Sequence, residues 1–113
     1  MNPHVIHRLK HYLEFFSRIP EEKWCTKTFH NNYGQSCALG HLGMHSGIPK
    51  ETEGSKELSS LLAPLMNASG TPTAGIIAVH INDGRGTSYR YGKNPKTRIV
   101  NALKTCLEME TSS

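Results

Sequence analysis

The chain has 113 residues, of which 36% are hydrophobic and 19% charged, and its net charge at neutral pH is +4. This length predicts a single globular domain over residues 1–113. No apolar run approaches the ~20 residues of a membrane span, and no signal-peptide core precedes the first amphipathic pattern, so we expect a cytoplasmic protein without a membrane partner. The chain has three cysteines, an odd number that argues against a disulfide framework. No two of them form a C-x-x-C pair, so the strong sequence signatures of a zinc site are absent.

The first predicted helix runs from Pro3 to about Ile19. Asn2 is suited to cap it, because Pro is favoured at the first helical position that follows a cap. Its apolar side chains recur at helical spacing and are Val5, Leu9, Tyr12, Leu13 and Phe16. A further helical turn is expected over residues 20–24, where Trp24, the only tryptophan, is interpreted as a core anchor.

A central helix is predicted over residues 37–47, with Ser36 as its N-cap. Cys37, His41 and His45 are spaced four residues apart, so that on one helix they fall within an arc of roughly 80°. A thiol and two imidazoles on one side of a short helix are not needed for folding. We therefore expect the chemistry of the protein to lie there.

The next helix is expected to begin at a Ser55 cap, and Pro64 is expected to kink or shorten it. Its predicted buried stripe consists of Leu58, Leu61, Leu62, Leu65 and Met66. A loop follows at residues 68–73. The β-branched, apolar segment 75–81 predicts a strand, because such runs between turn signals are typical of buried strands.

Residues 82–86 carry a turn signal, and residues 87–91 form either a hairpin strand or a long loop. Asn94 is expected to cap a last helix, whose inward side chains are Ile99, Val100, Leu103, Cys106 and Leu107. Residues 110–113 are expected to fray. The predicted fold class is therefore α+β, helix-rich, with about four helices and a small two- or three-stranded sheet.

Three segments together resemble one known group of proteins. They are Cys37-Ala38-Leu39-Gly40-His41, Ile81-Asn82-Asp83-Gly84 and Asn94-Pro95-Lys96-Thr97-Arg98-Ile99-Val100. The arrangement resembles small bacterial and phage proteins that carry C-x-x-G, often followed by His, then an N-D element and a helix beginning T-P-K-x-R-V. The resemblance covers roughly residues 35–107, with Asn94 where threonine is common. It implies a fold and the location of a site, and no assigned reaction.

Binding of an anion is the function that the sequence favours. Basic residues outnumber acidic ones around residues 85–98. Backbone N–H groups at helix starts donate hydrogen bonds to anions. The tyrosines at positions 89 and 91 could stack on a base. We predict non-catalytic binding of an anionic, nucleotide-like small ligand, with no cofactor, by Gln35, Ser36, His41, Asn82, Asp83, Arg85, Arg90, Lys96 and Arg98.

Two partner expectations accompany this prediction. The resemblance suggests a phage-type protein that sequesters a nucleotide signal and blunts a host defence. Double-stranded nucleic acid is not the expected partner, since no predicted helix has an exposed basic recognition face. The sequence leaves a homo-oligomer open.

The alternative function is a small cysteine hydrolase or transferase. Cys37 at a helix N-terminus would have a lowered pKa and act as nucleophile, with His80 as base and Asn82 or Asp83 as orienting residue. On the predicted strand, Asn82 would share a face with His80 and Asp83 would not. Gln35 could donate a hydrogen bond to an oxyanion.

The second alternative is a metal-binding domain that uses Cys37, His41 and His45, completed by His30 or His80. Residues eight apart on a helix are ~12 Å apart along its axis, so one ion would not reach all three. The preferred prediction therefore includes no metal.

All of these hypotheses share one spatial requirement. The start of the central helix, the far end of segment 76–81 and the start of the last helix, residues 94–98, must converge around a hollow that solvent reaches.

Overall fold

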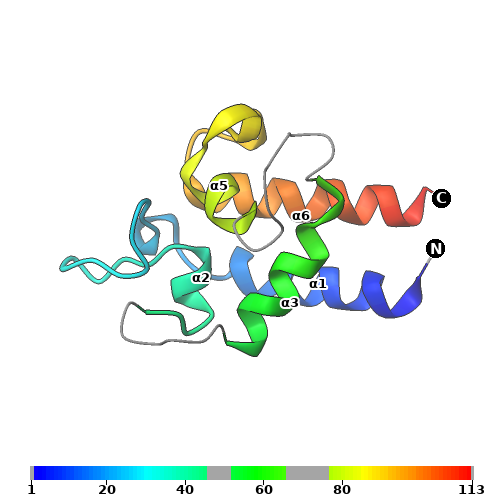
Figure 1. Ribbon diagram of the computed structural model, residues 1–113, viewed down its shortest axis with the longest axis horizontal. Coiled ribbons are helices and arrows are strands. Elements are labelled where there is room, and N and C mark those ends of the chain that lie inside the picture. The colour runs from blue at the N-terminus through cyan, green and yellow to red at the C-terminus, as the bar shows by residue number, and fades with distance from the viewer. Residues whose placement is uncertain (1, 46–51, 66–76, 113) are drawn as a thin grey trace.

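The computed structural model describes residues 2–45, 52–65 and 77–112 (Figure 1). The elements in these ranges are α1 (Pro3–Ser17), η1 (Glu21–Lys23), α2 (Ala38–His41), α3 (Glu53–Leu62), α5 (Ile77–Asp83), η3 (Gly86–Tyr91) and α6 (Pro95–Thr111), where η marks a 3-10 helix. The described ranges contain no strand, and only isolated bridges join Ser36 to Trp24 and His30. The predicted small sheet is therefore wrong, and the described fold is all-α.

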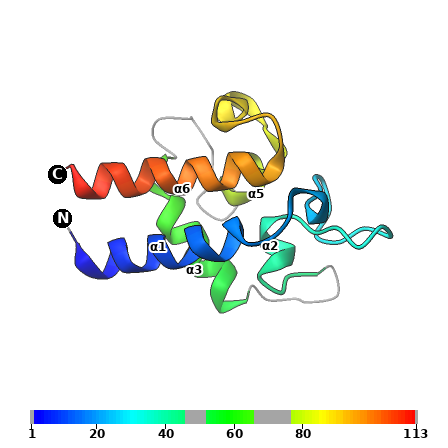
Figure 2. The ribbon, with the colours of Figure 1, turned by 180° about the vertical axis from the view of Figure 1, so that it is seen from behind.

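Helices α1 and α6 lie side by side and antiparallel, with the two ends of the chain close together (Figures 1 and 2). Their predicted caps are confirmed. The Asn2 side chain accepts a hydrogen bond from the backbone N–H of His4 at 3.0 Å, and that of Asn94 accepts one from Thr97 at 2.9 Å. Helix α6 continues through Thr111, so residues 110 and 111 are helical where fraying was expected.

Helix α3 crosses α1 and α6 (Figure 1). Thr52, not the predicted Ser55, is its N-cap, because the Thr52 hydroxyl accepts a hydrogen bond from the Ser55 N–H at 3.1 Å. The helix ends at Leu62, two residues before Pro64, as the predicted shortening requires. Met66 and the loop at 68–73 lie outside the described residues.

A strand was predicted at residues 75–81, but the structure has helix α5, Ile77–Asp83, there, so the predicted strand is wrong. Residues 75 and 76 lie outside the described ranges. An apolar β-branched run does not by itself distinguish a buried strand from a buried helix. Here burial follows the helical period, since Ile77, Ala78 and Ile81 are buried while Val79 and His80 are partly exposed. Residues 87–91, expected as hairpin strand or loop, belong to the 3-10 helix η3.

The predicted central helix is much shorter than expected. Cys37, not Ser36, is the N-cap of α2, and the helix ends at His41. A Schellman motif stops it: Gly43 has a φ of 94°, and the Met44 N–H donates to the Leu39 carbonyl at 3.1 Å. The glycine that ends this helix is therefore Gly43, four residues before the predicted end at residue 47.

The core lies where α1, α3, α5 and α6 meet. Its fully buried side chains include Leu9, Phe16, Leu58, Leu62, Ile77, Ile81, Ile99 and Leu103. Trp24 and Cys106 are 4% and 3% exposed, which confirms both as core residues. Within the described ranges, no helix is both long enough and apolar enough to cross a bilayer.

Candidate functional site

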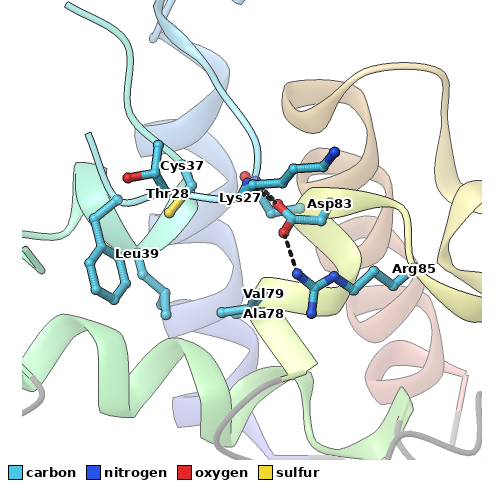
Figure 3. A pocket seen from close by; sticks show the side chains of 10 residues that line it. Lys27, Thr28, Cys37, Leu39, Ala78, Val79, Asp83 and Arg85 are labelled. Carbon is cyan, nitrogen blue, oxygen red and sulfur yellow. Dashed lines mark hydrogen bonds and ion pairs between the residues drawn. The ribbon is translucent and has the colours of Figure 1, made fainter. Parts of the chain in front are cut away.

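A pocket of about 320 Å³ opens between the loop at residues 27–29, the start of α2 and one face of α5 (Figure 3). Its walls are Lys27, Thr28, Phe29, Cys37, Leu39, Ala78, Val79, Asn82, Asp83 and Arg85. The charged residues gather at one side and the apolar ones form the rest of the wall. The pocket therefore offers an apolar surface that ends in a cluster of charges.

Asn82 joins the three segments that form this pocket. Its side-chain oxygen accepts a hydrogen bond from the Ala38 N–H at 2.9 Å, and its amide nitrogen donates to the Cys25 carbonyl and to Asp83, both at 2.9 Å. It is 1% exposed. Asn82, predicted as a catalytic and ligand-binding residue, lines the pocket, but its polar atoms are engaged in holding the walls together.

The C-x-x-G motif has a structural explanation. The thiol of Cys37 accepts a hydrogen bond from the Gly40 N–H at 3.5 Å, which caps α2. The Phe29 carbonyl accepts one from the Cys37 N–H at 3.1 Å, and a Cβ on Gly40 would lie 2.1 Å from that carbonyl oxygen. Only glycine allows the 27–29 loop to approach α2 closely enough to form the pocket wall.

The charged cluster centres on Asp83, whose side chain is 4% exposed. One carboxylate oxygen, Oδ1, accepts hydrogen bonds from the Lys27 N–H at 3.1 Å and from Asn82. The other, Oδ2, has no hydrogen-bond partner and lies 3.5 Å from Nη2 of Arg85. Lys27 and Arg85 lie on either side of this carboxylate (Figure 3).

Lys27 has a φ of 71°, which non-glycine residues rarely adopt. The bond from its backbone N–H to Asp83 stabilises the turn in this conformation. The 27–29 loop, which the sequence indicated only as an irregular polar connection, thereby contributes three pocket residues. No sequence pattern marked them, because the contact joins residues that are 56 positions apart.

Arg98 supports the pocket from behind and does not line it. Its guanidinium donates to the carbonyls of Ile81, at 3.0 Å, and Asn82, at 2.7 Å, and the residue is buried. It thus satisfies the last carbonyls of α5, where a cation is also favoured by the helix dipole. The start of α6 therefore stabilises α5 instead of contributing a ligand-binding group.

The other predicted ligand-binding residues lie away from this pocket. Arg90 is exposed on η3, and Lys96 lines a separate hollow beside Glu21. Ser36 bonds the His30 ring at 2.6 Å, and Gln35 donates to the Glu22 carbonyl at 3.0 Å.

His41 also lies apart from the pocket walls. Its ring packs against that of Trp24, with 4.7 Å between centroids, and burial lowers its pKa. Its Nε2 atom is buried without a hydrogen-bond partner.

The arrangement does not favour the cysteine-nucleophile alternative. Burial raises the pKa of the Cys37 thiol, the opposite of the lowering that was expected at a helix start. His80 and Asn82, which would share a face on a strand, point about 200° apart on α5. His80 is not among the residues that line the pocket with Cys37.

The metal alternative loses its geometric basis, because His41 is the last residue of α2 and His45 follows the helix. Among the residues that the structure describes, no three His, Cys, Asp or Glu side chains gather closely enough to hold an ion.

Comparison of the chain with known protein families, with curated proteins and with solved structures found no significant match.

Proposed function

We propose that the pocket between the 27–29 loop, α2 and α5 binds a small, nucleotide-like ligand that has an apolar body and an anionic group. The observation that carries this proposal is the pairing of an apolar wall with two cationic side chains, Lys27 and Arg85, at one side of the same pocket. Its volume of about 320 Å³ lies within the usual range for small-molecule sites.

The charges at this side favour an anion. Two cations flank the single carboxylate of Asp83, which leaves a local excess of one positive charge. Arg85 is 54% exposed, and its 3.5 Å contact with Asp83 is longer than a normal hydrogen bond. Its guanidinium is therefore free to turn and bind a phosphate through two parallel hydrogen bonds.

The apolar wall favours a flat or aromatic ligand body. Phe29, Leu39 and Val79 belong to three different segments and all line the pocket. A ring placed among them would bury apolar surface, and each Å² buried stabilises the complex by ~25 cal/mol. Non-catalytic binding requires no more than these two features.

A thermal-shift titration with adenosine 5′-monophosphate tests the proposal, with adenosine and inorganic phosphate as ligands that carry only half of its chemistry. A ligand at 100 times its dissociation constant adds ~2.7 kcal/mol to the free energy of unfolding. We expect the nucleotide to raise Tm more than either half. Equal or absent shifts for all three would contradict the proposal.

Matched arginine variants locate the binding site. Arg85→Ala should weaken nucleotide binding at least tenfold, whereas Arg90→Ala, which removes an exposed arginine five residues away, should leave it unchanged. Lys27→Gly should also weaken binding, and glycine is the residue best suited to the φ of 71° at that position. Equal effects of the two arginine variants would place the anion elsewhere.

The cytoplasmic location and the phage-type sequestering role, both expected above, are part of this proposal. Neither affects the binding tests, which use the isolated protein.

A further inference from the structure

The Asp83 carboxylate has one buried acceptor atom, Oδ2, that accepts no hydrogen bond within the described residues and has only an ion pair with Arg85. Its Oδ1 accepts two hydrogen bonds, from Lys27 and Asn82, whereas Oδ2 is buried in the pocket wall without any. The nearest cation, Nη2 of Arg85, is 3.5 Å away, beyond normal hydrogen-bond distance. A buried acceptor without a donor is rare in folded proteins and calls for an explanation.

We infer that the ligand donates an N–H group to Oδ2 of Asp83 while its anionic group binds Arg85. The ligand class is then an amino-substituted heteroaromatic phosphate. This inference rests on the proposed function and narrows it, because an anionic ligand without a donor would leave Oδ2 unsatisfied.

The geometry of the pocket supports an amino group on a ring. The acceptor lies at the side of the pocket where the apolar walls meet the charged cluster (Figure 3). A ring that packs among Phe29, Leu39 and Val79 carries its exocyclic amino group in the ring plane, at its edge. Once Arg85 turns away from Oδ2, which is covered in this structure, such an amino group reaches the carboxylate while the ring faces remain in apolar contact.

Ligand binding would also exchange the partners within the cluster. When Arg85 turns to the phosphate, Oδ2 of Asp83 loses its ion pair with Nη2 of Arg85, and the ligand N–H replaces that interaction. The bonds at Oδ1 remain in place, so the turn at Lys27 is undisturbed. The carboxylate then accepts the hydrogen bond from the ligand amino group without a change in the backbone of the pocket walls.

Calorimetric titration with two nucleotides that differ in one amino group tests this inference. Adenosine 5′-monophosphate carries the amino group, and purine riboside 5′-monophosphate has hydrogen in its place. We expect the adenine nucleotide to bind at least tenfold more tightly, because a buried acceptor discriminates strongly against a ligand that lacks the donor.

Asp83→Asn provides the matched variant, since its amide oxygen can still accept the two bonds made at Oδ1 while its NH₂ group replaces the acceptor at Oδ2. We expect the two nucleotides to bind this variant with affinities that differ by less than twofold, because loss of the negative charge beside Arg85 acts equally on their identical phosphates. Should this variant fail to fold, the comparison of the two nucleotides on the unmodified protein decides alone.

The outcomes separate the two proposals. Equal affinities of the unmodified protein for both nucleotides, or a preference for adenosine 5′-monophosphate that persists unchanged in Asp83→Asn, would overturn the donor inference and leave the anion pocket standing. Binding of neither nucleotide would overturn the proposed function and this inference with it.

Discussion

Gly40 shows how a single residue shapes the candidate site. The resemblance singled out C-x-x-G as a motif, and the alternative function made its cysteine a nucleophile. In the structure the cysteine caps a four-residue helix, and the glycine makes room for the Phe29 carbonyl. The motif is explained by packing alone, so its presence does not indicate a nucleophile.

Gly40→Ala should therefore destabilise the protein by at least about 1–3 kcal/mol, because its Cβ would lie 2.1 Å from a backbone oxygen that has little freedom to move. Urea unfolding measures the change. Gly54→Ala is the control. A Cβ at Gly54 would meet nothing closer than 3.5 Å, and Gly54 lies in α3, where alanine is a better helix former than glycine. Equal effects of the two substitutions would contradict the close approach of the 27–29 loop.

Helix α5 decides the fold class at the scale of the element. Its sequence has the composition of a strand, but intrinsic β preference is weak and depends on a neighbouring strand to pair with. The described ranges offer none, and the helical period buries Ile77, Ala78 and Ile81 against the core. Arg98, predicted as a phosphate ligand, instead binds the carbonyls at the end of this helix.

Arg98→Lys tests this assignment. Lysine cannot reproduce the guanidinium fork that bonds the Ile81 and Asn82 carbonyls, so we expect a loss of about 1–3 kcal/mol in the free energy of unfolding. Lys104→Ala, at an exposed position of α6, should change it by less than about 0.5 kcal/mol. A neutral Arg98→Lys would contradict the capping of α5.

The contact between α1 and α3 predicts a dependence of stability on pH. Hydrogen bonds from Arg8, and then from Tyr12, lower the pKa of Glu57 from 4.5 to about 2. The folded pKa lies below the unfolded one, so this stabilisation is complete above about pH 4.5 and is lost as pH falls toward 2.

Glu57→Gln removes the titration. The difference in urea midpoint between the unmodified protein and this variant should be constant above about pH 5 and shrink between pH 4.5 and 2. Glu14→Gln, in the exposed pair with Arg18, serves as the control and should have little effect at any pH. A difference for Glu57→Gln that persists unchanged to pH 2 would exclude the proposed linkage.

For the whole molecule, the sequence predicted those features that depend on local chemistry. The caps at Asn2 and Asn94 and the buried Trp24 and Cys106 follow from preferences of individual residues and are confirmed. The sheet was wrong because strand formation depends on a distant partner.

The sequence predicted those residues of the candidate site that local patterns mark, and missed those that depend on distant contacts. The sequence singled out Cys37, Asn82, Asp83 and Arg85, which the fold brings to one pocket. It did not indicate the 27–29 loop, whose placement depends on a turn with positive φ and on contacts across most of the chain. It also assigned binding to Arg98, whose donors are occupied by backbone carbonyls.

Amide chemical-shift mapping during titration with adenosine 5′-monophosphate tests the central claim most directly. We predict that the largest changes occur at Lys27, Leu39, Val79 and Asp83, which line the pocket from its three segments, and that they saturate together with one dissociation constant. Changes centred instead on the hollow beside Lys96, or no saturable change at all, would contradict the account.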